Sequence, residues 1–167
     1  MKKHTILIVD DEEMILKSIV RVLRNENYQI LTAQSGEKGL TVLKDYDVNL
    51  VISDQKMPGM NGIDFLKRVK TDYPKSLTIM LTGQSELEIA MDAINEAGVY
   101  KFILKPWNDN DLKVTIRRVL ETLELIWERE SLLQQVKSRD AVLQNLEKEN
   151  PGISKVERDE DGYIILD

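Results

Sequence analysis

Short apolar runs alternate with stretches in which apolar residues recur every three or four positions, over about the first 120 residues of the chain. The runs are rich in β-branched residues, which is typical of strands that are buried on both faces. We expect such strands at residues 5–9, 29–33, 49–53, 77–81 and 101–104. Their alternation with amphipathic stretches predicts an α/β fold, an open parallel sheet with helices on both faces.

Helix-start signals stand between the expected strands. The first helix is indicated by apolar residues at helical spacing, namely Met14, Ile15, Ile19, Val22 and Leu23. Later helices are expected to begin at Ser35, Asn61, Ser85 and Asn108, because Ser and Asn commonly cap helix N-termini. Glu88 stands three positions after Ser85, so we expect a capping box at that helix.

The last helix is predicted to be far longer than the others. No Pro or Gly interrupts the chain from Asp109 to Asn150, whereas helices in globular proteins average about 11–12 residues. An apolar stripe at heptad spacing, interrupted by two arginines, consists of Leu125, Leu132, Val136, Leu143 and Leu146, with Arg129 and Arg139 between them. Such a stripe needs a partner. We expect a homodimer through residues 109–150; the alternatives are a helix folded back on its own domain and a different protein partner.

This organisation divides the chain into three segments. We expect the α/β domain at 1–121, a helical coiled-coil extension at 122–150, and a short hairpin-like tail at 151–167 that follows Pro151-Gly152. Basic and acidic side chains are mixed along the extension, which is typical of a solvated helix face. We therefore expect no contact with nucleic acid there.

Composition excludes several classes of function. The net charge is -6, which disfavours nucleic-acid binding, and the absence of Cys excludes a disulfide framework and thiolate metal sites. The single His, His4, lies near the N-terminus and is expected to be solvated at a strand start. Its position disfavours Ser-His-Asp chemistry, and a single His disfavours multi-His zinc sites. No apolar run approaches the roughly 18 residues of a membrane span, so we expect a cytoplasmic protein without a membrane contact.

Residues that can carry chemistry follow four of the expected strands. Asp10 and Asp11 follow the first strand, Asp54 the third, Thr82 the fourth and Lys105 the fifth. Because the carboxyl ends of parallel strands share one edge of a sheet, we expect these side chains to meet there. Crowded carboxylates repel one another and require a cation, and oxygen ligands without His or Cys favour Mg²⁺ or Mn²⁺. A carboxylate can also act as a nucleophile toward phosphorus, with Lys and a hydroxyl group holding phosphate oxygens.

Five short segments along the expected strands and the loops after them form a specific combination: Ile6-Leu7-Ile8-Val9-Asp10-Asp11-Glu12, Val51-Ile52-Ser53-Asp54, Met57-Pro58-Gly59-Met60-Asn61-Gly62, Met80-Leu81-Thr82-Gly83 and Lys105-Pro106. Through these segments, residues 4 to about 121 resemble the receiver domain of bacterial two-component response regulators. The resemblance implies a flavodoxin-like, doubly wound sheet of five parallel strands in the order 2-1-3-4-5, with its fifth helix extended here into the long final helix.

The resemblance also implies a role for each site residue. Asp54 becomes the phosphoacceptor, and the metal ligands become Asp10, Asp11, Asp54 and the backbone carbonyl of Lys56, with Mg²⁺ as the cofactor and Mn²⁺ as a substitute. Lys105 and Thr82 contact the phosphoryl group, Thr82 and Phe102 form the switch, and the Lys105-Pro106 peptide bond is cis.

The function implied is that of a phosphoacceptor switch. It would receive a phosphoryl group from a sensor histidine kinase or a phosphotransfer protein. It would then contact an unknown downstream protein through the helix after Ser85, the strand at 101–104 and the long helix. We expect no enzyme activity beyond phosphorylation and dephosphorylation of Asp54 itself, since the second Asp of haloacid-dehalogenase-type phosphatases is replaced by Lys56. The alternative is a phosphorylation-independent coiled-coil scaffold with a vestigial acidic site.

Overall fold

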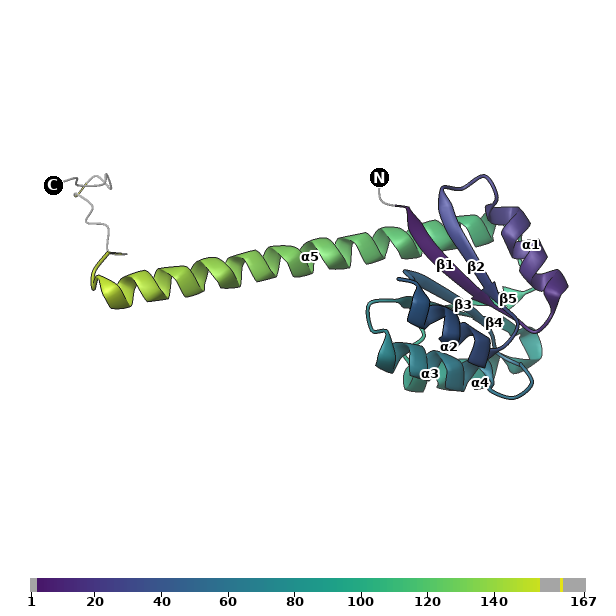
Figure 1. The fold of residues 1–167 in the computed structure, drawn as a ribbon. Helices are drawn as coiled ribbons and strands as arrows, with labels where there is room; N and C mark the ends of the chain where they lie inside the picture. Colours follow the sequence, from purple (N-terminus) through teal and green to yellow (C-terminus); the bar gives the residue numbers. More distant parts are fainter. Residues whose placement is uncertain (1–2, 154–159, 161–167) are drawn as a thin grey trace. The chain divides into compact units, whose positions relative to one another are not determined.

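The computed structural model describes residues 3–153 and residue 160, and its centre is a sheet of five parallel strands (Figure 1). The strands are β1 (His4–Val9), β2 (Tyr28–Ala33), β3 (Leu50–Asp54), β4 (Leu77–Gly83) and β5 (Lys101–Lys105). Their order is β2-β1-β3-β4-β5, and every neighbouring pair is parallel. The predicted fold class and strand order are therefore confirmed.

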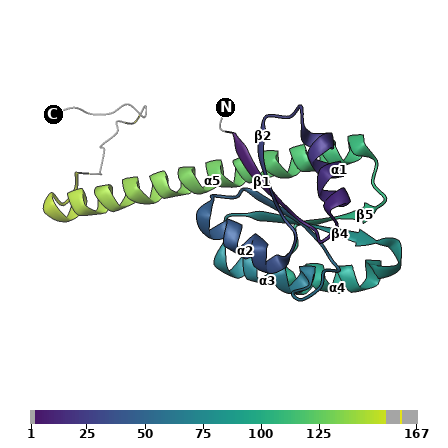
Figure 2. The ribbon, with the colours of Figure 1, turned by 45° about the vertical axis from the view of Figure 1, so that its right-hand side comes forward.

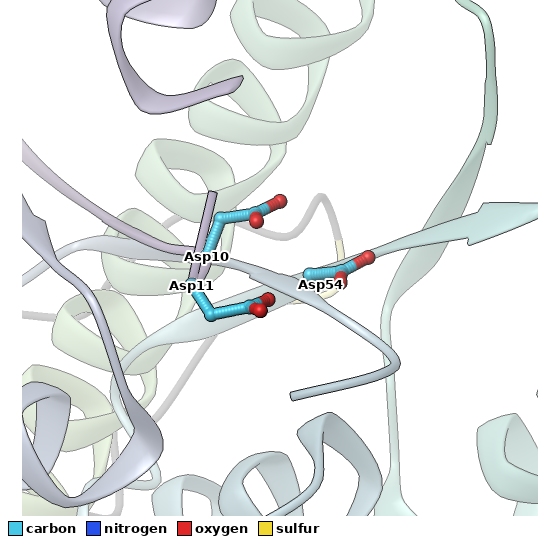
Figure 3. Close-up of side chains that lie close together, drawn as sticks. All are labelled: Asp10, Asp11 and Asp54. Atoms are coloured by element: carbon cyan, nitrogen blue, oxygen red, sulfur yellow. The ribbon is translucent and has the colours of Figure 1, made fainter. Parts of the chain in front are cut away.

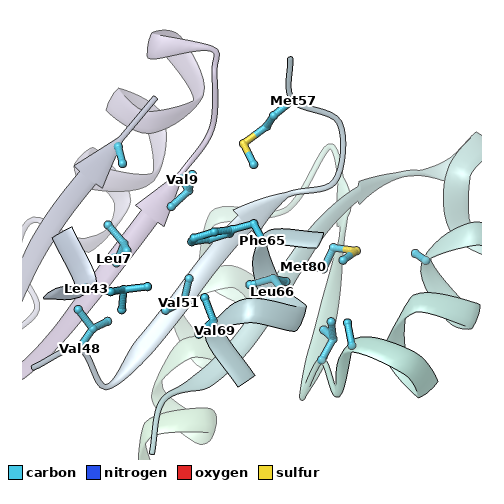
Figure 4. Close-up of a cluster of buried hydrophobic side chains, with 14 residues drawn as sticks. Leu7, Val9, Leu43, Val48, Val51, Met57, Phe65, Leu66, Val69 and Met80 are labelled. Carbon is cyan, nitrogen blue, oxygen red and sulfur yellow. The ribbon is translucent and has the colours of Figure 1, made fainter. Parts of the chain in front are cut away.

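Helices cover both faces of the sheet (Figure 2). Their bounds are α1 (Glu13–Leu23), α2 (Gly36–Asp45), α3 (Gly62–Asp72), α4 (Leu87–Ala97) and α5 (Asp109–Glu149). The core under α2, α3 and α4 takes up Leu7 and Val9 from β1 (Figure 4). The core under α1 and the start of α5 takes up Ile6 and Ile8. Successive side chains of a strand point to opposite faces, so the continuous apolar run of β1 fills both cores.

Three of the four predicted helix caps are present. The side chains of Ser35 and Asn61 accept hydrogen bonds from the backbone N–H groups of Lys38 and Asp64, at 3.2 and 2.8 Å. Asn108 accepts from the N–H groups of Asn110 and Asp111, at 2.9 and 3.2 Å. These bonds satisfy donors that a helix N-terminus otherwise leaves free.

The capping box predicted at Ser85 is wrong. Between β4 and α4 the chain makes a short 3₁₀ turn, Gln84–Glu86, and α4 begins at Leu87 without a side-chain cap. Ser85 lies inside that turn, whereas a capping residue stands in extended backbone just before the helix. The side chain of Glu86 forms an ion pair with Lys56 in the loop after β3, so it is engaged away from the helix end.

The chain divides into two compact units, Met1–Leu123 and Glu124–Asp167. In the first unit, α5 buries Leu112, Ile116, Val119, Leu120 and Leu123. Along the second unit, the residues of the apolar stripe are exposed. The uninterrupted helix expected from Asp109 is confirmed and ends at Glu149. Most of the tail predicted at 151–167 lies outside the described residues.

Two further expectations concern the exposure of His4 and the presence of membrane-spanning helices. His4 is buried in β1, with 9% of its surface exposed, so the prediction of a solvated His is wrong. His4 is already part of the sheet, paired with Tyr28 of β2, and it is buried together with the rest of β1. Within the described part of the chain, no helix combines the length and the hydropathy that a bilayer crossing requires.

Candidate functional site

Three carboxylates meet at the carboxyl edge of the sheet (Figure 3). Asp10 and Asp11 come directly after β1, and Asp54 is the last residue of β3, the neighbouring strand. One carboxylate oxygen from each lies within 4.8 Å of those of the other two. Asp10 is fully buried and Asp54 is buried, whereas Asp11 is exposed. The convergence predicted for these three residues is thus present.

Lys105 is the cation of this cluster. It ends β5, and its ammonium group reaches past the end of β4 to Asp54 Oδ1 at 2.8 Å and Asp10 Oδ2 at 3.4 Å. Partial burial alone would lower the pKa of Lys105, but the hydrogen bond and the charge of Asp54, together with those of Asp10, outweigh it and raise the pKa. Lys105 therefore carries a permanent positive charge beside Asp54.

Asp10 is the most enclosed carboxylate of the cluster. Its Oδ1 accepts a hydrogen bond from the backbone N–H of Glu12 at 2.9 Å. Burial raises the pKa of Asp10, and the negative charge of Asp54 adds to that rise, while the Glu12 N–H and Lys105 oppose it. The Glu12 N–H and the Lys105 ammonium group thus both favour the ionised form of Asp10.

The donor set fits a small divalent cation bound by oxygen ligands. One Lys leaves two of the three carboxylate charges in the cluster uncompensated when all are ionised. Exposed Asp11 faces water, which suits Mg²⁺ or Mn²⁺ because these ions keep several water ligands. The residues that could hold the ion are Asp10, Asp11 and Asp54.

Backbone packing sets the position of Asp54. The N–H of Gly62, the first residue of α3, donates to the carbonyl of Gln55 at 2.9 Å. A Cβ atom at Gly62 would lie 1.9 Å from the backbone oxygen of Asp54, far inside van der Waals contact. Glycine is needed here for close approach, since the start of α3 lies directly against the phosphoacceptor candidate.

Thr82 lies one residue beyond the register partner of Asp54. Leu81 pairs with Asp54 across β3 and β4, and Thr82 is fully buried. Its hydroxyl donates to Gln55 Oε1 at 2.5 Å, with the carbonyl of Gly83 at 3.3 Å as a second acceptor. The structure therefore places Thr82 beside the residue that follows Asp54, and a Thr82 contact with Asp54 itself is not among those observed in the described residues.

The remaining predicted residues lie around this edge. Phe102 is half-buried and packs against the core under α2, α3 and α4, at the β5 position opposite Met80. The Lys56 side chain is exposed and bound to Glu86. The predicted cis bond between Lys105 and Pro106 is confirmed. The roles assigned to these side chains stay predictions.

Two residues at this edge were missed by reasoning from the sequence. Gln55 accepts the Thr82 hydroxyl, and Glu86 pairs with Lys56. A signal for Gln55 existed, because it is a polar residue that directly follows a buried strand. For Glu86 no sequence signal was available, since its partner is thirty positions earlier and the intervening 3₁₀ turn was not anticipated.

Curated relatives match most of this chain but only part of their own length. The hydrogenase transcriptional regulatory protein HoxA of Cupriavidus necator is 33% identical over 85% of this chain and 29% of its own. The nitrogen assimilation regulatory protein NtrX of Azorhizobium caulinodans is 35% identical over 78% and 29%. A cyclic di-GMP phosphodiesterase of Thermotoga maritima is 30% identical over 81% and 36%. The chain thus spans about three tenths of the first relatives it matches.

Solved receiver domains share the fold. A CheY-like response regulator receiver domain from Methanospirillum hungatei has a TM-score of 0.69 and 33% identity, over 74% of this chain and 98% of its own. The signal receiver domain of an HD domain-containing protein from Pseudomonas fluorescens has a TM-score of 0.73 and 34% identity, over 77% and 95%. Residues 6–117 match the family described as the response regulator receiver domain. With the five-stranded parallel sheet and the acidic edge that it carries, this chain belongs to the response regulator receiver domain family.

Proposed function

We propose that this chain is a phosphoacceptor switch that takes a phosphoryl group from a histidine kinase or a phosphotransfer protein onto Asp54. The observation that carries the proposal is the contact of Lys105 with Asp54 at 2.8 Å, beside Asp10 and Asp11. A carboxylate next to a fixed cation and a candidate metal site can attack phosphorus while the charge on the transferring group is stabilised.

The transfer is a nucleophilic displacement at phosphorus. An Asp54 carboxylate oxygen forms the new P–O bond while the P–N bond of the donor phosphohistidine breaks. The electron pair of that bond stays on the imidazole nitrogen. Water later cleaves the acyl phosphate to restore Asp54 and release inorganic phosphate. The chain therefore hydrolyses only the phosphoryl group that it carries on Asp54. It acts as a cytoplasmic signalling module.

Each neighbouring residue has a part in this chemistry. Asp10, Asp11 and the backbone carbonyl of Lys56, with Asp54, would hold Mg²⁺, or Mn²⁺ in its place. When bound, the ion neutralises charge on the phosphoryl oxygens. Lys105 lies within contact distance of Asp54 and can pair with a phosphoryl oxygen there.

Thr82 and Phe102 would convert phosphorylation into a change of surface. The Thr82 hydroxyl turns toward a phosphoryl oxygen, and the half-buried Phe102 ring moves further into the core beside β4. These motions bias a two-state surface on α4, β5 and α5, which contacts the downstream protein. Exposed Ile89, Met91, Tyr100 and Leu104 on α4, β5 and their connection give that surface its apolar character.

The test of phosphoacceptor function is intact mass after incubation with acetyl phosphate and Mg²⁺. We expect one added phosphoryl group in the wild type, and none without metal or in Asp54→Asn. Asp47→Asn, which alters an exposed carboxylate in a loop, is the matched control and should be modified normally. If the wild type gains no phosphoryl group and binds no beryllofluoride, the phosphorylation-independent scaffold becomes the better explanation.

We further propose that the long helix forms a homodimer through residues 109–150. The stripe residues Leu125, Leu132, Val136, Leu143 and Leu146 are 64, 55, 55, 54 and 38% exposed. Two such helices can bury their stripes against each other at heptad spacing.

Because the chain contains no Cys, engineered thiols can test this proposal directly. In a parallel, in-register dimer, Leu132→Cys and Leu143→Cys should each form an intermolecular disulfide, since equivalent residues then face each other. Ser131→Cys, one position outside the stripe, is the control and should stay reduced. In an antiparallel dimer, a disulfide would form either between Leu132→Cys of one chain and Leu143→Cys of the other, or at only one of these two positions. A monomeric wild type in sedimentation would contradict self-association.

A further inference from the structure

We infer that Gln55 is a positioning residue of the switch: its side-chain oxygen holds the Thr82 hydroxyl in the resting chain and so opposes the change that phosphorylation drives. The inference rests on the proposed function of Asp54 and Thr82, and it adds a residue that sets the resting balance of that switch. The juxtaposition that carries it is the buried hydrogen bond between the Thr82 hydroxyl and Gln55 Oε1, at 2.5 Å.

Both partners of this bond are shielded from water. Thr82 is fully buried and Gln55 is 5% exposed. A threonine hydroxyl has a single proton, so it donates to one acceptor at a time. Its only other acceptor among the described residues is the carbonyl of Gly83, at 3.3 Å. Donation to a phosphoryl oxygen on Asp54 therefore requires Thr82 to give up Gln55.

The backbone of Gln55 cannot move with Thr82, because its N–H and its carbonyl are both hydrogen-bonded to other elements. Its N–H donates to the carbonyl of Leu81 in β4 at 3.0 Å, and its carbonyl accepts from the N–H of Gly62 at 2.9 Å. The backbone of Gln55 is thus held between β4 and the start of α3. Movement of Thr82 toward Asp54 therefore draws the hydroxyl away from a residue whose backbone is held in place.

The expected size of the effect follows from the ordinary net strength of a hydrogen bond. Removing one buried acceptor from the resting state should shift the balance toward the phosphorylated conformation by about three- to tenfold. Met is the appropriate replacement, because it has a flexible chain of similar length and no comparable acceptor. Gln55→Met therefore removes the acceptor without leaving an empty space of the size that Ala would create.

The test is a double-mutant cycle read by beryllofluoride affinity in the presence of Mg²⁺. The four proteins are the wild type, Gln55→Met, Thr82→Val and the double variant; Val keeps the shape of Thr without the hydroxyl. We expect Gln55→Met to tighten beryllofluoride binding about three- to tenfold when Thr82 is present, and to leave it unchanged in the Thr82→Val background. Gln29→Met, at an exposed position of β2, should change nothing in either background.

The outcomes separate this inference from the proposed function. A wild type that binds no beryllofluoride removes both. A wild type that binds it overturns the role of Gln55 alone in two cases: when Gln55→Met leaves affinity unchanged or weakens it, and when the substitution has the same effect in both Thr82 backgrounds. Unfolding free energies of the same four unliganded proteins supply a second reading. A coupling near zero there would show that the hydrogen bond does not hold Thr82 in the resting chain.

Discussion

The acidic edge of the sheet and the distal part of α5 depart from ordinary burial in opposite directions. At the sheet edge, polar side chains are enclosed: Asp10 and Thr82 are fully buried, and Gln55 is 5% exposed. Along residues 124–149 of α5, large apolar side chains such as Leu125 and Leu132 are more than half exposed. Buried polar groups and exposed apolar groups are the informative exceptions to the usual distribution.

The contrast shows that the two regions are completed in different ways. The sheet edge satisfies its polar groups within the chain, since no buried side-chain nitrogen or oxygen in the described residues lacks a hydrogen-bond partner. Lys105 compensates only one of its three carboxylate charges, so a further cation would stabilise the cluster. The helix satisfies its backbone internally but leaves its stripe in water. One region thus presents carboxylates that suit a small cation, and the other presents an exposed apolar stripe.

Charges placed in the stripe should produce the largest effect. Leu132→Glu together with Leu143→Glu removes two apolar contacts from each helix of the proposed dimer, and each buried Leu contributes about 1.5–3 kcal/mol. We expect the dissociation constant, measured by sedimentation equilibrium, to rise by at least about a thousandfold. Ser131→Glu, with an equal charge outside the stripe, should leave it within about threefold. Equal weakening by both variants would locate the interface elsewhere.

A methyl group at the start of α3 should destabilise the fold at the acidic edge of the sheet. Gly62→Ala places a Cβ against the backbone oxygen of Asp54, and the forced separation should cost on the order of 3 kcal/mol in unfolding free energy. Gly83→Ala is the matched control, because a Cβ there meets no atom within 4 Å and its φ is not positive. Urea unfolding should show a large loss for the first variant and none for the second. A loss for Gly62→Ala as small as that for Gly83→Ala would mean that the start of α3 can move away from Asp54.

Magnesium should stabilise the acidic edge and leave the stripe unchanged. At a hundredfold excess over its dissociation constant, a cation that binds only the folded chain adds about 2.7 kcal/mol to the unfolding free energy. Asp11→Asn should reduce this gain, and because Asp11 is exposed the substitution leaves no buried partner unpaired. Thermal unfolding at constant ionic strength, with and without Mg²⁺, measures the gain. The same gain in wild type and Asp11→Asn would remove Asp11 from the ligand set.

Replacement of Glu37 should have the smallest effect on stability, and its pH dependence should be confined to acid conditions. Hydrogen bonds from the backbone N–H of Glu37 itself and from that of Met60 hold its pKa below the ordinary 4.5. A carboxyl whose pKa is lower in the folded state stabilises above its unfolded pKa and loses that contribution as pH falls through the folded value. The difference in Tm between the wild type and Glu37→Gln should therefore narrow from pH 7 to pH 3. Glu88→Gln, exposed on α4, serves as the comparison and should show no such narrowing.

The sheet was predictable from the sequence because its strands are continuous apolar runs. Each expected strand lies within one or two residues of the observed bounds. The meeting of Asp10, Asp11 and Asp54 was also predictable, because parallel strands end at one edge and these residues follow β1 and β3. In both cases a local pattern carries the information.

The misses share a different cause. The failed cap at Ser85 and the buried Gln55 both depend on how the loops after β3 and β4 meet: Glu86 pairs with Lys56, and Gln55 accepts from Thr82. His4 is buried in β1, where it pairs with Tyr28 of β2. Contacts between segments far apart in the chain leave no periodic trace in the sequence. The position of Gln55 directly after a buried strand was a local signal for a polar residue at the site, but its partner Thr82 could not be read from that signal.

The placement of the site residues at strand ends has a consequence for insertions and deletions. Asp54 is the last residue of β3 and Lys105 the last of β5, and each is aligned by strand register with its neighbour in β4. One residue added inside either strand would turn every following side chain to the opposite face. One residue added in the distal part of α5 would rotate the rest of the stripe by about 100°. Spacing between residues is therefore as strictly constrained in this protein as their identity, and natural variation in length should be confined to the loops beyond the strand ends.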